Sequence, residues 1–468
     1  MTARPLSRRR TIAAAGAVSV GLLARKARAA TDADVIVIGA GLSGLHAAQV
    51  LEDGGLSVLV LEGNTRVGGR VRTLLDKPET PETGGSEVGP LYARVIDQVN
   101  RFGLKLQPWQ VEKLDFALNI GGELMSPKDW PTSSKNPFTG PLRNLPPLAL
   151  SSAFMPKESG LKDIESWLGE DRGQPDPSLH DFYVSKGADE NALRFLSLGA
   201  QADSLKDEST LWNRRGQKML EWARGNGPFS HVVGGMSKVP IAMAGALKRE
   251  VMLNRPVEGI LTDDNGVTVS CASGKAFKGK YAVCTVPASV LRTIKIGPDL
   301  PALQKEAVAT LPYGQSTSVF FAITEKFWEV DGLGSSLWTD GPAGRAFDWL
   351  IPNGNYIWMF MPGQINKALR GMNDTEALDH AVKALHAARP STKGRIEPIA
   401  VANWSANPWS RGVTAYRAPG QIAKFGGVMA EPHGRIHFAG EHTAVLQSGL
   451  EGAMESGERA ALEVLQRG

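Results

Sequence analysis

The chain contains little cysteine and no residue grouping typical of a metal site. Among its 468 residues are two cysteines, Cys271 and Cys284, which lie in separate strand-like segments. A disulfide-rich scaffold is therefore excluded, and two buried thiols suit these apolar surroundings better than a disulfide, although the sequence leaves their pairing open. Because no CxxC pair and no close His/Cys grouping occurs, we predict no metal site.

Long apolar segments are also missing. After residue 29, no stretch reaches the ~18 uninterrupted apolar residues that a membrane-spanning helix needs. We therefore expect no membrane span in the mature protein. The remaining composition, 42% hydrophobic and 21% charged, is that of an ordinary globular protein, and a chain of this length is expected to form two or more domains.

Neither sign of charge dominates once the first 29 residues are set apart. That segment holds seven Arg and Lys residues and no acid, which leaves 45 basic against 48 acidic residues in the rest of the chain. The formal net charge of +4 therefore reflects the N-terminal segment. The remainder gives no reason to expect nucleic-acid binding.

The N-terminal segment has the layout of an export signal. Three arginines, Arg8, Arg9 and Arg10, precede a short apolar run rich in Ala and Gly, and residues 27–29 (Ala-Arg-Ala) offer a small-x-small cleavage site. Twin arginines are typical of the route that exports folded, cofactor-loaded proteins. We predict that residues 1–29 are a signal peptide recognised by the twin-arginine export machinery, and that the mature protein is periplasmic or secreted. A basic disordered tail is the alternative.

The most informative pattern runs from residue 34 to Glu62. A β-branched apolar run predicts a buried parallel strand, a Gly-rich turn and a helical pattern follow, and a second apolar strand ends on Glu62. In the GxGxxG turn, Gly39 permits the tight bend, Gly41 lets the backbone approach a pyrophosphate, and Gly44 lets helix and strand pack closely. Free N–H groups at the helix start would hold phosphates and Glu62 would accept hydrogen bonds from a ribose, so the unit predicts a nucleotide cofactor.

Further Gly-rich segments extend the predicted site. Residues 63–73 combine glycines with arginines, so that the backbone can press against a flat ligand while Arg66 and Arg70 meet phosphate. Residues 84–90 form a second such loop. Near the C-terminus a strand stops at Gly440, and a Gly-rich stretch from Gly449 opens the last helix, whose unpaired N–H groups would face a ring or a phosphate.

Between these segments the sequence changes character. Residues 107–156 show no sustained period, whereas residues 161–168, 188–199 and 208–224 have helical patterns. Short strands then form a meander that leads to a buried strand over residues 281–286. From residue 301 to 388 strands alternate with helices, and the tryptophans there fit a sheet that lines a ligand cavity, although an aromatic core explains any single one of them equally well.

Taken together, these motifs resemble the flavin-containing monoamine oxidase family, a branch of the FAD-dependent amine oxidoreductases. The resemblance covers most of the chain after the leader, with the motifs in the family's order. The motifs are GAGLSG with Glu62, RVGGRVRT at 66–73, ETGGSEVGP at 82–90, GGM at 234–236, TVPASVL at 285–291, and FAGEHT with EGAMESGERAA within 438–461.

The resemblance implies an α/β fold in which an FAD/NAD(P)-binding Rossmann-like domain is interleaved with an α+β substrate domain, as in monoamine oxidases. The FAD-binding domain is expected to be discontinuous and to comprise residues 31–106, 229–300 and 395–468. Residues 107–228 and 301–394 are expected to form the substrate domain. FAD is the implied cofactor, with its ring held near Arg70, Gly85 and Glu441. The cofactor-binding residues that we predict are Gly39, Gly41, Gly44, Glu62, Gly63, Arg66, Gly69, Arg70, Gly85, Ser86, Val257, Gly440, Glu441, Gly449 and Leu450.

Several positions depart from the family pattern. The family's usual lysine, linked through a water to the flavin, is Ser318 here, and the covalent-flavin cysteine position of animal members is Val413, so FAD is expected to be non-covalent. The two cage tyrosines correspond to Thr414 and Leu450, which removes aromatic assistance to the amine. We assign Ser318, Thr414 and Leu450 to the catalytic face of the flavin. The carboxylate-binding arginine of amino-acid oxidases falls at Tyr92.

The activity implied is hydride transfer from the α-carbon of a neutral amine to FAD, which gives an imine that hydrolyses to an aldehyde or ketone. Reduced FAD would be reoxidised by oxygen or by another acceptor. The missing lysine charge and the export signal favour a periplasmic electron acceptor. Alternatives are a desaturase- or isomerase-like FAD enzyme that acts on an apolar C–C bond, an L-amino-acid oxidase, and a flavin-bound but catalytically quiet export or redox partner. Substrate identity and oligomeric state stay open, with a homodimer among the alternatives.

Overall fold

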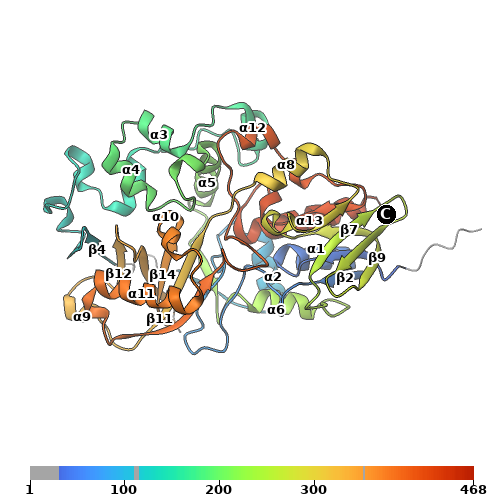
Figure 1. Cartoon of the computed structure of the whole chain (residues 1–468), viewed down its shortest axis with the longest axis horizontal. Helices are drawn as coiled ribbons and strands as arrows, with labels where there is room; N and C mark the ends of the chain where they lie inside the picture. Colours follow the sequence, from blue (N-terminus) through green and yellow to red (C-terminus); the bar gives the residue numbers. More distant parts are fainter. Residues whose placement is uncertain (1–30, 110–114, 352–353, 468) are drawn as a thin grey trace, which may run out of the picture.

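The computed structural model describes residues 31–109, 115–351 and 354–467 (Figure 1). The predicted signal peptide, residues 1–29, lies outside the described residues. Within these ranges, no helix combines the length and the apolar character needed to cross a bilayer. No cluster of three or more His, Cys, Asp or Glu side chains there is arranged to hold a metal ion, and both cysteines are buried free thiols.

The predicted βαβ unit supplies the two strands at one end of the first sheet, whose order is β10-β7-β8-β9-β1-β2. Strand β1 (Ala33–Ile38) pairs in parallel with β2 (Val58–Leu61) and with β9 (Ala276–Cys284), and β9 also pairs in parallel with β16 (Ile436–Phe438). Two distant parts of the sequence thus join this sheet, β9 directly beside β1 and β16 beside β9. This confirms the prediction that residues 281–286 contain a strand of the first sheet.

Both faces of this sheet are covered, which explains its nearly continuous apolar strands. Val35 and Val37 face a helical layer, whereas Ile36 and Ile38 face the other side, so alternate residues of β1 enter two separate hydrophobic clusters. The helical layer consists of α1 (Leu42–Asp53), α2 (Ala93–Arg101), α6 (Lys238–Gly245) and α13 (Gly449–Leu465). The strands β7 (Val257–Thr262), β8 (Val267–Cys271) and β10 (Lys295–Gly297) belong to the same sheet. The opposite face of the sheet packs on two helices, α7 (Ala288–Leu291) and α8 (Ala302–Thr310).

The second sheet lies beside the first and is mostly antiparallel (Figure 1). Its outer face packs on the last long helix of that region, α11 (Asp374–Ala388), through Val319, Phe321 and Met359. The strands, in spatial order, are β15 (Ile396–Asn403), β11 (Ser316–Ile323), β14 (Gly354–Pro362), β13 (Arg345–Ile351), β12 (Ser336–Thr339), β4 (Phe116–Ile120) and β5 (Glu123–Met125).

A group of helices faces the inner side of the second sheet. Three of them begin at an N-cap side chain that accepts a backbone N–H, namely Ser178, Asp189 and Ser209. These helices are α3 (Leu179–Ser185), α4 (Glu190–Ser197) and α5 (Thr210–Ala223). The remaining short elements are β3 (Leu106–Pro108), β6 (Ser230–Val232), α9 (Trp328–Asp331), α10 (Gly363–Asn366) and α12 (Gln421–Phe425).

One helical prediction is wrong. Residues 161–168 form only a short 3₁₀ turn over Ser166–Leu168 instead of a helix. The Asp163 carboxylate accepts the N–H groups of Glu165 and Ser166, which gives the backbone a local alternative to helical hydrogen bonds. Apolar spacing alone does not reveal that competition.

Two elements lie across the predicted domain boundaries. Strand β15, assigned with residues 395–468 to the cofactor domain, pairs with β11 in the second sheet. Helix α8, assigned with residues 301–394 to the substrate domain, packs through Ala307 and Val308 into the cluster below the first sheet. Neither element has a sequence feature that specifies which sheet it joins. The domain division itself stays a prediction.

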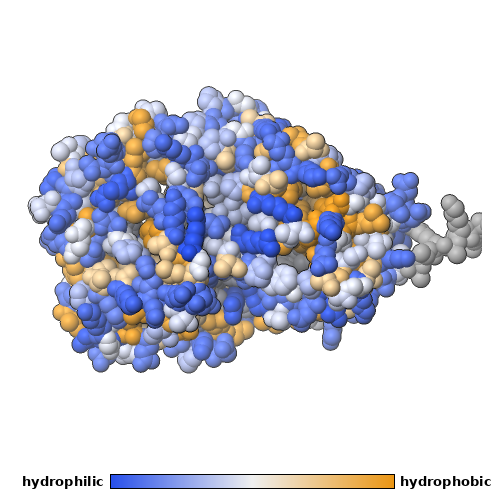
Figure 2. Space-filling model, in the orientation of Figure 1, coloured by the Kyte–Doolittle hydropathy of each residue, from blue (hydrophilic) through white to orange (hydrophobic). Residues whose placement is uncertain are grey.

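The surface drawn in Figure 2 is mixed, with apolar patches (orange) set among hydrophilic residues (blue). Large exposed hydrophobic side chains occur on several elements, for example Leu261 on β7 and Val330 on α9. Scattered exposure of this kind is normal for a globular protein.

Candidate functional site

A cavity of about 960 Å³ connects the two sheets. One part of its wall is the Gly-rich turn after β1, the end of β2 and the loops at residues 68–71 and 82–87. The other part is the inner face of the second sheet together with helices α3, α4 and α5. A ligand in this cavity would contact segments from both ends of the chain and from the middle.

The three glycines of the first turn have different surroundings. A Cβ on Gly44 would lie 1.9 Å from the carbonyl oxygen of Gly39, and Gly39 itself has φ of +104° and abuts the Thr285 hydroxyl. These two glycines therefore serve close packing of the turn. Gly41 lines the cavity, and a Cβ there would come no nearer than 3.9 Å, to Cα of Gly69. The backbone at Gly41 is thus open to a close-lying ligand, whereas a Cβ on Gly69 would lie 3.3 Å from Cα of Gly41, so Gly69 lets the two loops approach.

Glu62 lies at the end of β2 with its carboxylate in the cavity wall. The N–H of Ala40 donates to its Oε2 at 2.7 Å, and the N–H of Asn64 donates to its Oε1 at 2.8 Å. Burial raises the pKa of Glu62, and these two N–H groups act in the opposite direction. The carboxylate is therefore held in one position beside the turn that the sequence assigned to phosphate binding.

The two predicted arginines of the following loop differ in environment. Nη1 of Arg66 donates to the carbonyl oxygens of Val67 and Val71, and its Nη2 donates to that of Gly69. Arg66 is absent from the cavity wall, and these contacts brace its own loop. The sequence could not distinguish these roles, because a guanidinium suits carbonyl oxygens as well as phosphate.

Arg70 does face the cavity and connects three segments. Its Nη1 donates to the carbonyl oxygen of Val413 at 2.5 Å and pairs with Oε2 of Glu441 at 3.3 Å. The buried Glu441 carboxylate also accepts the N–H of Ala415 at 3.4 Å. The Gly-rich loop, the segment around residue 413 and the loop after β16 are therefore held together at the centre of the cavity.

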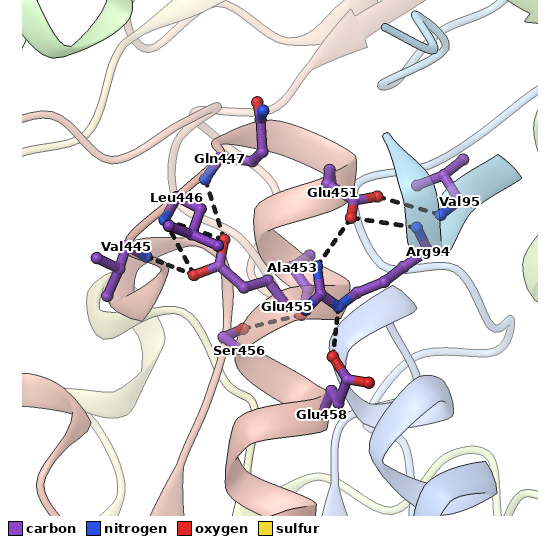
Figure 3. Close-up of polar contacts among 10 residues, drawn as sticks. All are labelled: Arg94, Val95, Val445, Leu446, Gln447, Glu451, Ala453, Glu455, Ser456 and Glu458. Carbon is purple, nitrogen blue, oxygen red and sulfur yellow. Dashed lines mark hydrogen bonds and ion pairs between the residues drawn. The ribbon is translucent and has the colours of Figure 1, made fainter. Parts of the chain in front are cut away.

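The start of α13 is fixed by its own glutamates, as Figure 3 shows. The Glu455 carboxylate accepts the N–H groups of Val445, Leu446 and Gln447 at 2.8–3.0 Å, and so holds the loop that leads into the helix. Residues 448–450, which line the cavity, follow directly after this loop. The sequence marked this segment as a motif but gave no signal that Glu455 folds back onto the loop.

A second glutamate of the same helix anchors α2. The Glu451 carboxylate accepts the N–H groups of Arg94 and Val95 at 3.1–3.2 Å, and Arg94 also pairs with both Glu451 and Glu458 (Figure 3). Glu451 is nearly inaccessible, whereas Glu458 is partly exposed. The two contacts position α13 against the helix that follows the second Gly-rich loop.

The inner face of the second sheet supplies an aromatic wall. Tyr356, Trp358 and Phe360 on β14 line the cavity beside Ser318 on β11. The indole Nε1–H of Trp358 donates to Oγ of Ser318 at 2.9 Å. Across the cavity wall, the Thr414 hydroxyl lies 2.8 Å from Oε1 of Gln201. Such a surface suits a largely apolar ligand that is oriented by a few polar groups.

Most of the predicted site residues lie together in this cavity. Those that line it are Gly39, Gly41, Glu62, Gly63, Gly69, Arg70, Gly85, Ser86, Val257, Ser318, Thr414, Gly440, Glu441, Gly449 and Leu450. Gly44 and Arg66 do not line it, for the packing and bracing reasons given above. For every predicted site residue, contact with a cofactor or a substrate stays a prediction.

Glu208 is a cavity residue that the sequence did not single out. It lies near the start of α5, and burial raises its pKa to about 7, although the Asn213 side chain acts to lower it. Tyr183 and Tyr416 also line this part of the cavity, and burial, followed by the charge of Glu208, raises the pKa of Tyr183 to about 12. A glutamate at the start of a predicted helix carries no sequence signal of such burial.

Glu208→Gln should remove a pH dependence from the stability of the protein. Because the folded-state pKa is raised from 4.5 to about 7, protonated Glu208 contributes stability below pH 4.5 that is lost as the pH rises through 7. We expect the variant and the wild type to unfold alike near pH 4.5, and the variant to be more stable by about 1–3 kcal/mol near pH 8. Thermal unfolding across this range measures the difference. Glu170→Gln, at an exposed carboxylate, is the control, and a difference of equal size at every pH would contradict the expectation.

Comparison with known proteins identifies the architecture. The family model described as flavin containing amine oxidoreductase matches residues 42–465. A flavin-containing amine oxidase of Danio rerio is 28% identical over 467 residues, which cover 92% of this chain and 85% of the relative. Flavin-containing amine oxidase B of Homo sapiens is 28% identical over 469 residues, with coverage of 92% and 86%.

Solved structures have the same fold. Cyclohexylamine oxidase from Brevibacterium oxydans superposes with a TM-score of 0.76 at 23% identity and covers 93% of this chain and 99% of its own. Wild-type putrescine oxidase bound to putrescine gives a TM-score of 0.77 at 22% identity, with the same coverage. These likenesses confirm the mixed α/β fold with a Rossmann-like domain that the sequence predicted.

Proposed function

This chain belongs to the flavin-containing amine oxidoreductase family, and on that premise we propose that it takes hydride from the α-carbon of a neutral amine. The family confirms the predicted class, an FAD-dependent oxidoreductase that acts on amines. We propose further that the imine product hydrolyses to an aldehyde or ketone. The observation that carries this proposal is one continuous cavity that joins the nucleotide-type turn to an aromatic wall.

The residues of the cavity fit FAD. Open backbone at Gly41 suits a pyrophosphate, and Glu62 suits a ribose. The ring would lie near Arg70 and Glu441, and bound FAD would supply the hydride acceptor. Because Val413 offers no thiol, we propose that FAD is bound non-covalently. Denaturation of the purified protein should then release all of its flavin into solution.

The chain's own contribution is orientation and exclusion of water. Tyr356, Trp358 and Phe360 present aromatic side chains to the apolar part of an amine, and a substrate packed against them displaces water from the reacting carbon. Thr414 and Leu450 leave space where an aromatic cage would otherwise narrow the approach. The site therefore orients its substrate mainly through the wall of the second sheet.

Anaerobic bleaching of the flavin tests this function. The purified holoenzyme is mixed, without oxygen, with primary, secondary and polyamines, with α-amino acids and with apolar alkenes, and the flavin absorbance is followed. Bleaching by amines, with the matching carbonyl product, is the expected result. Bleaching by alkenes alone would favour the desaturase-like alternative, which the apolar wall also accommodates.

Ser318→Lys should raise the oxygen reactivity of the reduced enzyme. We propose that an acceptor other than oxygen reoxidises the flavin, because no ammonium stands at this position to favour oxygen reduction, and Ser318 Oγ instead accepts a hydrogen bond from Trp358. We expect reoxidation by oxygen to accelerate about tenfold or more in stopped-flow experiments. Ser318→Gln, long but uncharged, is the control. Equal rates in the lysine and glutamine variants would contradict the proposal.

We propose that the chain is exported by the twin-arginine route. Replacement of Arg8, Arg9 and Arg10 together by lysine keeps the charge and removes the twin-arginine motif. Mature protein should then disappear from the periplasm of a bacterial host that has this pathway and accumulate in its cytoplasm. Arg25→Lys with Arg28→Lys is the control. Unchanged periplasmic yield in the triple variant would exclude this route.

A further inference from the structure

One charged side chain lies on the aromatic wall of the cavity. Ser318 pairs with Phe360 across β11 and β14, Phe360 pairs with Arg345 across β14 and β13, and Arg345 pairs with Trp338 on β12. Residues paired in this way project from the same face of a sheet. All four line the cavity. Several residues on the described strands of this sheet line the cavity, and of these only Arg345 carries a charge.

The guanidinium of Arg345 is poorly satisfied. Its Nη2 donates to the carbonyl oxygen of Leu198 at 3.3 Å, whereas its Nε is buried without a hydrogen-bond partner. Within the described part of the chain, no carboxylate lies within ion-pairing distance of Arg345, in contrast to Arg70, which pairs with Glu441. Burial lowers the pKa of Arg345, which reflects the same lack of compensation.

The loop above Arg345 leaves room for this side chain. A Cβ on Gly199 would lie 3.0 Å from Nη2 of Arg345, so glycine at this position lets the guanidinium lie under the loop at the cavity wall. A cation held in an apolar cavity without a counter-charge costs free energy, and a ligand that supplies an anion offsets that cost. The planar guanidinium is suited to a carboxylate, with which it forms two parallel hydrogen bonds.

We propose that Arg345 binds a carboxylate of the substrate, so that the preferred substrates are amines with a carboxylate at the far end of the molecule. This inference rests on the proposed function, because the amine must lie at the flavin while the acid lies at Arg345. Ser318, the position assigned to the flavin face, lies two strands away from Arg345 in the same row of the sheet. The Cα atoms of these two residues are therefore about 10 Å apart. An α-amino acid cannot span that separation with its amine and carboxylate, whereas an ω-amino carboxylate can.

The test compares ligands that differ only at the far end. ε-Aminocaproate, its neutral amide and hexylamine are compared as reductants of the flavin under anaerobic conditions, in wild type, Arg345→Met and Arg345→Lys. In the wild type we expect ε-aminocaproate to bleach the flavin at about 10- to 100-fold lower concentration than the other two. The methionine variant should lose this preference and still accept hexylamine, and the lysine variant should retain part of it.

A ligand without an amine separates this proposal from the proposed function. Caproate should perturb the flavin spectrum and raise the melting temperature of the wild-type holoenzyme, and neither effect should occur in Arg345→Met. If caproate binds in this way and no amine bleaches the flavin, the anion site stands and the proposed function fails. If caproate has no effect and hexylamine matches ε-aminocaproate, the anion site is overturned while amine oxidation stands. A preference for the carboxylate that survives in Arg345→Met overturns it as well.

Discussion

Gly457→Ala is expected to destabilise the protein by about 2–4 kcal/mol and to deplete it of FAD. Gly457 lies in α13 where that helix crosses α1, and an added Cβ would lie 2.2 Å from the carbonyl oxygen of Ser43 and 3.0 Å from its carbonyl carbon. The contact is with helix backbone, which cannot rotate away as a flexible side chain could. The two helices must separate, and α1 begins at the turn that we assign to the cofactor phosphates.

A matched control lies in α5. Gly216 is also a helical glycine, but a Cβ there would meet no atom within 4 Å, so Gly216→Ala should be neutral or stabilise by up to about 1 kcal/mol. Thermal unfolding and the ratio of flavin to protein absorbance measure both variants. Equal stability and flavin content in the two variants would show that the α1–α13 crossing is not the tight contact described.

Glu455→Gln is expected to cost about 2–4 kcal/mol and to lower FAD occupancy. Its carboxylate accepts three consecutive N–H groups of the loop before α13, and a carboxamide offers one oxygen and brings an NH₂ group toward the remaining donors. The loop would shift, and with it residues 448–450 in the cavity wall. Unfolding in urea and titration of the apoprotein with FAD measure the two effects.

Glu458→Gln is the control, because it lies three residues further along α13 and is about one-third exposed. Glu458 pairs with Arg94, which keeps Glu451 as a partner, so the expected loss is below about 1 kcal/mol. If both variants lost the same stability, the effect would come from the charge of the helix and not from the loop.

The local pattern of the sequence predicted the cofactor part of the fold well. Residues 34–62 carry strand, turn and helix signals in succession, and the structure contains β1, α1 and β2 there. The packing role of Gly44 also follows from the motif, because it depends on neighbours a few residues away. In these segments, local preference and tertiary structure agree.

The parts that sequence could not predict depend on distant partners. Arg66 and Arg70 occur in similar loop sequence, but only Arg70 has Glu441 within reach. Arg345 gained significance only once its register with Phe360 and Ser318 was known. Strand β15 has an ordinary strand sequence, and only its pairing with β11 assigns it to the second sheet. Pairings of this kind are set by the whole fold.

If this cavity brings the α-carbon of an amine to FAD, the rate of anaerobic flavin bleaching should depend on deuteration of that carbon. We expect bleaching to slow severalfold relative to the undeuterated amine, because the C–H bond breaks in the step observed. Equal rates for the two isotopologues, or no bleaching by any amine while dithionite still reduces the flavin, would contradict this expectation.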